Sequence, residues 1–328
     1  MSRDHSSGDL AADRRYLWAE ASLKEGDAPA AADLFHQALA LAPHFSAAVF
    51  GLGSALERMG DVDGARTAYR RCLDQRPDDV FGAGLSLARL DGATPAAMPQ
   101  DYVARLFDDY AGRFESHLVG ALHYRGPAIL VEALEAVTAA QQRPCRFLQA
   151  LDLGCGTGLM ADALGGRVQW IDGVDLSSGM LAQAAARGHY RSLIQADITA
   201  ALAMLPAGQS YDLVIAADVL VYLGDLGDLF RAIAAALAPG GLFAFTVQAG
   251  PDGGYALGGD LRFSHGAGYL GAVAGAAGLR LTHLAPAVTR KDAGRDVAGY
   301  AAVLESADQP PRTTGRDSSC VQSVMDPS

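Results

Sequence analysis

The residues with the clearest chemical meaning form the stretch Leu-Asp-Leu-Gly-Cys-Gly-Thr-Gly at positions 151–158. The apolar run that ends at Asp152 predicts a buried strand. Gly154, Gly156 and Gly158 predict a tight turn, in which the backbone can approach a ligand closely because glycine has no side chain. If a helix begins after the turn, its free amide groups can face an anionic part of that ligand. The stretch therefore predicts a small-molecule site between a strand and a helix.

The spacing of these glycines differs from the Gly-x-Gly-x-x-Gly pattern of nicotinamide-dependent enzymes. Residues 151–158 instead resemble the nucleotide-binding loop of class I S-adenosylmethionine-dependent methyltransferases. The resemblance implies a Rossmann-like α/β fold, whose sheet is mostly parallel with a final antiparallel strand, and S-adenosyl-L-methionine as the cofactor. An ordinary glycine-rich turn is the alternative interpretation. The resemblance assigns cofactor binding to Asp152, Gly154, Cys155, Gly156, Gly158, Asp175, Leu176, Asp197, Ile198 and Ala217.

Two carboxylates follow the loop where this resemblance requires them. Asp175 ends the second predicted strand, about twenty residues after the loop, where a carboxylate can accept hydrogen bonds from both hydroxyl groups of a ribose. The alternative role of Asp175 is an N-cap, although Ser177 is the better N-cap of the next helix. Asp197 follows the third strand, where the family binds the adenine, and its alternative role is an N-cap before Thr199.

The acceptor side is defined by weaker signals. The resemblance places residues 216–219, Ala-Ala-Asp-Val, where the methionine part of the cofactor meets the acceptor. The Asn-Pro-Pro-Tyr signature of nitrogen methylation on adenine or glutamine is absent there, which disfavours those substrates. Methyl transfer is an in-line displacement on an activated sulfonium, and alignment alone can lower such a barrier by ~7–11 kcal/mol. A catalytic base is therefore optional.

The candidate residues on this side are aromatic or ionisable side chains. A helix-and-lid segment is expected at 107–114 and 122–127, because both stretches resemble bacterial predicted methyltransferases that carry tetratricopeptide (TPR) repeats. His265 is expected in a loop beyond the fifth strand, and each candidate has an alternative role as a surface or lid side chain. The candidate catalytic residues are Asp218, Tyr222 and His265, and the candidate lid or acceptor residues are Tyr110, Phe114, His123 and Tyr124.

An internal repeat occupies the first quarter of the chain. Similar residues recur at an offset of roughly 34 positions, the period of TPR repeats. Residues 13–79 resemble two such repeats, each a pair of antiparallel helices. Their role could be a concave surface for a peptide or partner protein, or a helical appendage that aids folding or dimerisation. The matching pairs are Ala19 and Gly53, Ala31 and Ala65, Phe35 and Tyr69, Ala38 and Cys72, and Pro43 and Pro77.

Strand and helix patterns alternate from residue 147 onward, which predicts a parallel sheet with helices on both faces. The last two strands, 279–284 and 297–304, have no helix between them and are expected to form an antiparallel hairpin. The expected organisation is a TPR-like helical domain at 10–92, a linker at 93–100, a methyltransferase domain at 101–305 that includes a lid segment at 101–127, and a disordered tail at 306–328.

Composition narrows the range of functions. The 328 residues carry a formal net charge of -11 and no run of Lys or Arg, which disfavours a nucleic-acid partner. The four cysteines lack the Cys-x-x-Cys spacing of zinc sites, so no metal is expected. A disulfide would be awkward at Cys155 inside the glycine loop, which fits a reducing compartment. Because the N-terminus is also polar and no apolar stretch approaches the ~18 residues of a membrane span, a cytoplasmic enzyme is predicted. The alternatives are a TPR adaptor with a vestigial cofactor fold and, against the glycine spacing, an NAD(P)-dependent oxidoreductase.

Overall fold

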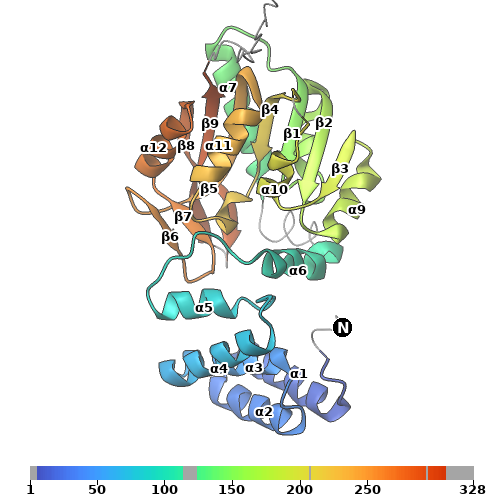
Figure 1. Ribbon diagram of the computed structural model, residues 1–328, viewed down its shortest axis with the longest axis vertical. Coiled ribbons are helices and arrows are strands. Elements are labelled where there is room, and N and C mark those ends of the chain that lie inside the picture. The colour runs from blue at the N-terminus through green and yellow to red at the C-terminus, as the bar shows by residue number, and fades with distance from the viewer. Residues whose placement is uncertain (1–5, 114–123, 207, 293–294, 308–328) are drawn as a thin grey trace, which may run out of the picture.

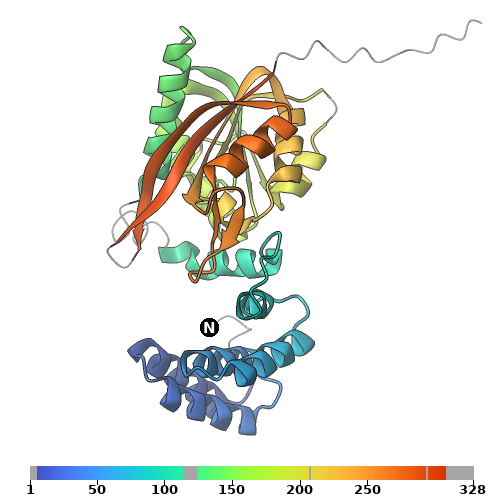
Figure 2. The same cartoon turned by 90° about the vertical axis from the view of Figure 1, so that its left-hand side faces the viewer.

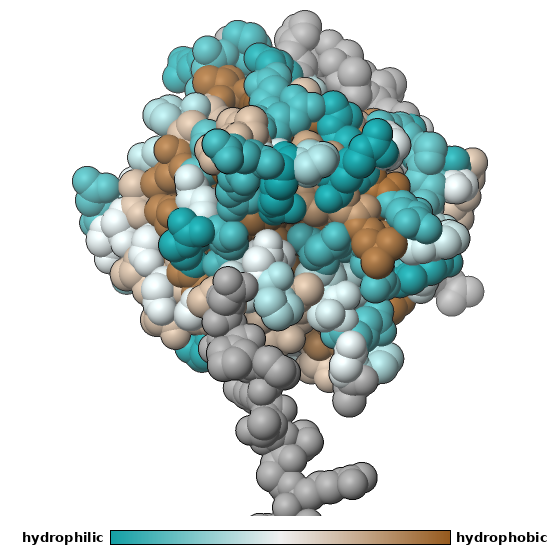
Figure 3. Space-filling view, turned by 90° about the horizontal axis from the view of Figure 1, so that it is seen from above, coloured by the Kyte–Doolittle hydropathy of each residue, from teal (hydrophilic) through white to brown (hydrophobic). Residues whose placement is uncertain are grey.

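The computed structural model describes residues 6–113, 124–206, 208–292 and 295–307. In this part of the chain, a group of helices precedes an α/β domain, and the two lie end to end along the long axis of the molecule (Figures 1 and 2). Helix α6 (Gln100–Tyr110) lies between them (Figure 1). The opposite end of the α/β domain, which Figure 3 faces, carries hydrophilic side chains interspersed with hydrophobic ones.

The N-terminal helices form two helical hairpins that share one apolar core. A Cβ atom on Gly51 would lie 2.3 Å from the ring of Phe35, and one on Gly53 would lie 2.6 Å from the ring of Tyr69. Glycine is therefore needed at these positions for the helices to approach so closely, and the hairpins agree with the two expected repeats. The helices are α1 (Leu10–Glu25), α2 (Ala28–Leu41), α3 (Ser46–Arg58), α4 (Val62–Gln75) and α5 (Ala83–Leu90).

The α/β domain is built on one sheet. Strands run parallel in the order β3-β2-β1-β4-β5, after which β9 pairs with β5 and β8 with β9, both antiparallel. The predicted mostly parallel sheet with an antiparallel ending is confirmed. The strands are β1 (Phe147–Leu153), β2 (Val168–Asp175), β3 (Ser192–Gln195), β4 (Tyr211–Ala216), β5 (Leu237–Ala249), β6 (Tyr255–Leu257), β7 (Phe263–His265), β8 (Leu279–Asp292) and β9 (Arg295–Ser306).

Helices cover both faces of this sheet. Leu213 and Ile215 of β4 pack in the core that α7 and α8 cover, whereas Val214 and Ala216 pack in the core that α10, α11 and α12 cover. No helix in the described ranges is both long and apolar enough to cross a bilayer. Besides α6, the helices are η2 (Ala111–Arg113), α7 (Gly126–Ala140), α8 (Leu159–Leu164), η4 (Gly165–Arg167), α9 (Ser178–Arg187), α10 (Ile198–Ala203), η5 (Leu220–Tyr222), α11 (Gly227–Ala236) and α12 (Ala267–Ala276).

The hairpin of β6 and β7 was not predicted. It extends the carboxyl end of β5, because β7 pairs in parallel with Gln248 and Ala249 and β6 pairs antiparallel with β7. Each of its strands has three residues, which is too short for a periodic pattern to indicate a strand. The hairpin contains residues that the sequence analysis placed in a loop, among them His265.

The segment at 93–100, predicted as a linker, is hydrogen-bonded to the α/β domain. The amide of Met98 donates to the carbonyl of Tyr222 at 3.0 Å, and the amides of Gly224 and Asp225 donate to the carbonyl of Ala96 at 2.8 and 2.9 Å. Met98 is buried in a cluster that also contains Leu85 of α5. The segment is therefore packed against the α/β domain and is not a free linker. The predicted domain boundaries stay a prediction.

Candidate functional site

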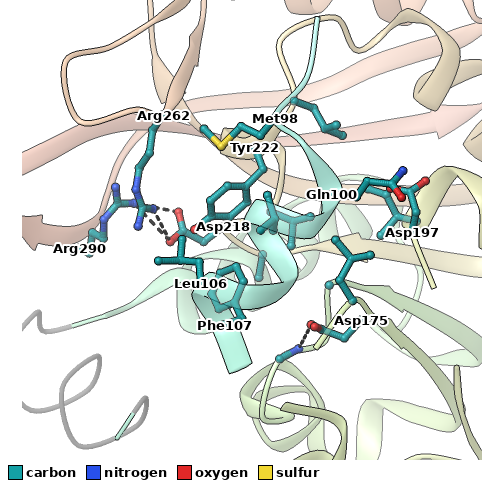
Figure 4. Close-up of a pocket in the computed structure, with 18 of the residues that line it drawn as sticks. Met98, Gln100, Leu106, Phe107, Asp175, Asp197, Asp218, Tyr222, Arg262 and Arg290 are labelled. Carbon is teal, nitrogen blue, oxygen red and sulfur yellow. Dashed lines mark hydrogen bonds and ion pairs between the residues drawn. The ribbon is translucent and has the colours of Figure 1, made fainter. Parts of the chain in front are cut away.

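A cavity of about 370 Å³ lies at the carboxyl ends of the parallel strands, where open α/β sheets bind their ligands. Residues at the ends of four neighbouring strands line one half of it, and the other half is lined by α6, η5, β8 and residues 93–100, here called the connecting segment (Figure 4). The lining residues are Met98, Gln100, Val103, Leu106, Phe107, Tyr124, Gly154, Gly156, Asp175, Leu176, Asp197, Ile198, Ala217, Asp218, Val219, Tyr222, Leu223, Arg262 and Arg290.

The glycine loop turns through left-handed backbone conformations. The φ angles of Gly154, Gly156 and Gly158 are 66°, 54° and 91°, which side-chain-bearing residues adopt rarely. A Cβ atom on Gly154 would lie 2.3 Å from Val219, whereas one on Gly156 would meet no heavy atom within 4 Å. Gly154 is therefore required by packing, and Gly156 leaves open space at the edge of the cavity.

Asp175 fixes this loop to the end of β2. One carboxylate oxygen accepts a hydrogen bond from the amide of Gly156 at 2.8 Å, and the other accepts one from the amide of Ser177 at 2.8 Å (Figure 4). Ser177 itself caps α9 through a hydrogen bond from the amide of Met180, so the N-cap role belongs to Ser177 as expected. Burial raises the pKa of Asp175, although the two amides oppose the shift.

Asp152, Cys155 and Gly158 do not line the cavity. Asp152 is only 1% exposed and accepts a hydrogen bond from the hydroxyl of Tyr190 at 2.7 Å. Burial raises its pKa to about 7. The amide of Cys155 donates to the carbonyl of Val174, and Gly158 faces Arg187. These residues support the loop from beneath.

Asp197 is both a helix cap and a residue of the cavity wall. Its carboxylate accepts hydrogen bonds from the amides of Thr199 and Ala200 at 2.9 and 3.1 Å, so it caps α10. It also lines the cavity together with Leu176, Ile198 and Ala217. Four of the cofactor-binding residues that the resemblance implied therefore line the same cavity.

Among the candidate catalytic residues, Asp218 and Tyr222 line the cavity and His265 does not. The expectation that His265 lies in a loop was wrong, because it ends β7 and is fully buried. Its Nε2 atom lies 3.1 Å from the carbonyl oxygen of Gly224, and its ring stacks on Tyr269. Burial lowers the pKa of His265 to about 4. The neutral ring thus supports the segment after η5.

Of the candidate lid residues, Tyr124 lines the cavity. Phe114, His123 and the side chain of Tyr110 lie outside the described residues. Burial raises the pKa of Tyr222 to about 12 and that of Tyr124 well above its ordinary value. Both phenols are therefore protonated at neutral pH, and their hydroxyl groups can donate hydrogen bonds.

Two arginines on the cavity wall were missed by sequence reasoning. Nη1 of Arg290 lies 3.0 and 3.3 Å from the two carboxylate oxygens of Asp218, and Nη1 of Arg262 lies 3.7 Å from one of them. Asp218 holds this position with a φ of 60°, and its amide donates to the hydroxyl of Thr246 at 2.9 Å. Arg262 lies in a region that was expected to be a loop, and Arg290 lies beyond the strand expected at 279–284, so neither position indicated a site.

Helix α6 closes the cavity from the side of the repeats. Asp108 accepts hydrogen bonds from the hydroxyl of Ser177 at 2.5 Å and from the amide of Gly179 at 3.2 Å, which fastens α6 to the start of α9. This contact places Leu106 and Phe107 on the cavity wall (Figure 4). The sequence predicted a lid segment here, but it did not predict that this segment contacts the start of α9.

Comparison with known proteins agrees with this architecture. Residues 151–245 match the family model described as a methyltransferase domain, and residues 22–89 match that of the tetratricopeptide repeat. The ubiquinone biosynthesis O-methyltransferase of Brucella ovis is 30% identical over 135 residues, which are 39% of this chain and 54% of that protein. The protein of the same name from Ruegeria pomeroyi is 32% identical over 102 residues, which are 31% of this chain and 41% of that protein.

The chain thus spans about half the length of the curated relatives it matches. Among solved structures, the magnesium protoporphyrin IX methyltransferase of Synechocystis PCC 6803 is 15% identical with a TM-score of 0.48, over 65% of this chain and 100% of that chain. The glycine loop, Asp175, Asp197 and Asp218 all fall within the matched range of the first family. Residues 151–245 therefore belong to the methyltransferase domain family, and residues 22–89 belong to the tetratricopeptide repeats.

Proposed function

We propose that the protein is a methyltransferase that uses S-adenosyl-L-methionine and transfers its methyl group to a protein or small-molecule acceptor. The observation that carries this proposal is the geometry of the glycine loop at the strand-end cavity. Gly156 leaves open space there, and the carboxylate of Asp175 stands beside it on the cavity wall. The glycine spacing argues against an NAD(P)-dependent oxidoreductase, and the intact loop at an open cavity argues against an adaptor with a vestigial cofactor fold.

The residues at the strand ends fit the chemistry of this cofactor. A ribose offers two hydroxyl donors, for which the carboxylate of Asp175 is the acceptor. Leu176 and Ile198 supply apolar side chains that can enclose an aromatic base, and Asp197 adds a polar acceptor at the same edge. The amides of Cys155, Gly156 and Gly158 already donate to Val174, Asp175 and Cys155, so they shape the turn and do not bind the carboxylate of the methionine part.

The bound cofactor would supply a sulfonium methyl group that needs no further activation. The chain itself contributes alignment and exclusion of water, which can lower the barrier of such a reaction by ~7–11 kcal/mol. Leu106 and Phe107 cover the cavity from α6, and the protonated hydroxyl groups of Tyr124 and Tyr222 can orient the acceptor by donating hydrogen bonds. The name of the curated relatives favours oxygen as the acceptor atom.

The repeats are proposed to recruit a protein or peptide partner, or the acceptor itself. Cytoplasmic location is also a proposal. Its support is that Cys72, Cys145 and Cys155 are free thiols, which persist in a reducing compartment.

Calorimetry on the purified protein tests the cofactor. We expect S-adenosylmethionine and S-adenosylhomocysteine to bind, and NADH to bind far more weakly. A preference for NADH would exclude the methyltransferase proposal. Mass spectrometry of cell extract incubated with the protein and methyl-labelled cofactor then identifies the acceptor and its methylated atom.

The variant Asp175→Ala tests whether this cavity is the cofactor site. A hydrogen bond to a charged group contributes about 1.5–3 kcal/mol. Loss of the ribose contacts should therefore weaken cofactor binding on the order of tenfold to several-hundredfold. Asp228→Ala on α11, whose side chain is 85% exposed, is the matched control. Unchanged affinity in a folded Asp175→Ala protein would place the cofactor elsewhere.

A further inference from the structure

The acceptor half of the cavity contains a cluster of charged side chains that the proposed methyl transfer does not itself require. Arg262, Arg290 and Asp218 line the same side of the cavity, across from Asp175 and Asp197 (Figure 4). The two arginines come from the segment before β7 and from β8, so the fold brings them together from distant parts of the chain. Both guanidinium groups lie within 4 Å of the carboxylate of Asp218.

Arg290 is held in this position at a structural cost. Its side chain is only 4% exposed, and a buried charge is tolerated when it is paired and hydrogen-bonded. Asp218 supplies that pairing through two short contacts to Nη1. A guanidinium carries five N–H donors on three nitrogens, so a carboxylate at Nη1 does not exhaust what Arg290 can offer a ligand.

The surroundings of the cluster are apolar or aromatic. The guanidinium carbon of Arg262 lies 5.6 Å from the ring centroid of Tyr222, and the ring of Phe107 meets Tyr222 edge-on at 5.5 Å. Met98 and Leu106 complete this wall. Low polarity strengthens the attraction between a guanidinium and an anion, which arginine can bind through two parallel hydrogen bonds.

We propose that the acceptor has an apolar or aromatic body and one anionic group, a carboxylate or a phosphate, which binds at Arg262 and Arg290. Asp218 then acts as a positioning residue that holds the two guanidinium groups side by side. A cationic acceptor that binds Asp218 would be repelled by both arginines. This inference names the chemical class of the acceptor, and it rests on the proposed function because only a methyltransferase has a methyl acceptor.

Small probes can test the anion site without knowledge of the acceptor. Calorimetry on the full-length protein loaded with S-adenosylhomocysteine would compare cinnamate with its uncharged analogue cinnamamide and its cationic analogue cinnamylamine. We expect cinnamate to bind at least tenfold more tightly than cinnamamide, and cinnamylamine to bind most weakly. Phenyl phosphate, measured alongside cinnamate, shows which of the two anionic groups the site prefers.

Substitution of one arginine then locates the site. Arg262→Gln should reduce the preference for cinnamate over cinnamamide to less than threefold, and Arg262→Lys should keep part of it. Arg231→Gln, on the exposed surface of α11, is the matched control and should leave the preference unchanged. Because Arg290 is buried, Arg290→Lys is interpreted only after circular dichroism shows a folded protein.

The outcomes separate this inference from the proposed function. Equal affinity for cinnamate and cinnamamide, tighter binding of cinnamylamine, or a preference that survives Arg262→Gln would overturn the anion site even if S-adenosylhomocysteine binds. Absence of S-adenosylhomocysteine binding would instead overturn the methyltransferase proposal. In that case the preference for cinnamate, measured on the same protein without cofactor, still tests whether an anionic group binds at the two arginines.

Discussion

The two halves of the cavity are built in different ways. In the half assigned to the cofactor, the lining residues lie at the ends of β1, β2, β3 and β4, and a main-chain loop held by Asp175 forms part of the wall. In the half assigned to the acceptor, the connecting segment, α6, η5 and β8 each contribute side chains. The first half depends on backbone geometry at neighbouring strand ends, whereas the second depends on how remote elements pack. Its side chains can therefore change without disturbing the cofactor loop.

The largest expected effect concerns the cofactor half. Gly156→Val places a branched side chain in the open space of the cavity and at a φ of 54°, a conformation that costs an L-residue roughly 1–2 kcal/mol. We expect cofactor affinity to fall more than a hundredfold, which is about 2.7 kcal/mol. Calorimetry with S-adenosylhomocysteine measures this loss.

Gly165→Val separates backbone strain from occlusion of the cavity. Gly165 has a similar φ of 51° and also has no heavy atom within 4 Å of a Cβ position, but it lies outside the cavity. We expect Gly165→Val to lower stability while cofactor affinity stays unchanged. If both variants lose the cofactor equally, strain explains the result and Gly156 is not at the binding surface.

The free energy of unfolding should depend on pH through Asp152, which lies beneath the cofactor loop. Burial raises the pKa of Asp152 from 3.8 to about 7, so the folded protein retains a proton that the unfolded chain releases. The stability that this group contributes is present below about pH 4 and is lost as the pH rises toward 7, at up to about 1.4 kcal/mol per pH unit. Asp152→Asn removes this dependence, because its side chain is neutral at every pH.

Urea unfolding of the wild type and of Asp152→Asn at pH 5 and pH 8 measures the effect. We expect the variant to gain free energy of unfolding relative to the wild type as the pH increases. Asp228→Asn, at an exposed position, should track the wild type. A constant difference between Asp152→Asn and the wild type across this range would show that Asp152 is already ionised in the folded protein.

A third variant disturbs only the acceptor half. A Cβ atom on Gly224 would lie 2.5 Å from the ring of Tyr255 and 2.8 Å from the carbonyl oxygen of Pro95. Gly224→Ala should therefore displace the connecting segment from η5, at a cost of about 1–3 kcal/mol in stability. We expect methyl transfer to fall about tenfold while cofactor affinity stays within threefold.

Gly271→Ala on α12 is the control, because nothing lies within 4 Å of its Cβ position. Turnover and cofactor affinity should both remain at the wild-type level in that variant. Wild-type turnover in Gly224→Ala would mean that the position of the connecting segment does not affect methyl transfer. Loss of cofactor binding would mean that the two halves of the cavity are not independent.

The same contrast explains what sequence patterns could predict. The glycine loop and Asp175 were predicted because their spacing is local and their backbone conformation needs glycine. Arg290 was missed because only the closure of the sheet by β8 and β9 brings it within 3.0 Å of Asp218. Met98 was assigned to a linker because its turn-rich surroundings do not show that its amide pairs with Tyr222.

His265 shows the opposite error. Its residue type suggested chemistry, and a short unpredicted strand buries it instead. A ring with a pKa near 4 that faces a carbonyl oxygen supports the fold, so His265→Ala should act through stability. Residue type alone was therefore weak evidence for catalysis, because burial away from the cavity favours a structural role for this histidine.

The smallest expected effect concerns the hydroxyl group of Tyr222. Tyr222→Phe keeps the ring contacts with Phe107 and Arg262 and removes only a hydrogen-bond donor from the cavity wall. One hydrogen bond contributes about 0.5–1.5 kcal/mol, so we expect turnover to fall about two- to tenfold. Cofactor affinity should stay within about threefold, or ~0.7 kcal/mol, because Tyr222 lies beside Arg262 in the acceptor half. Turnover and cofactor titration of the variant against Tyr300→Phe on β9 measure both quantities once the acceptor is identified. A larger loss in cofactor affinity than in turnover would assign Tyr222 to the cofactor half and contradict the division of the cavity.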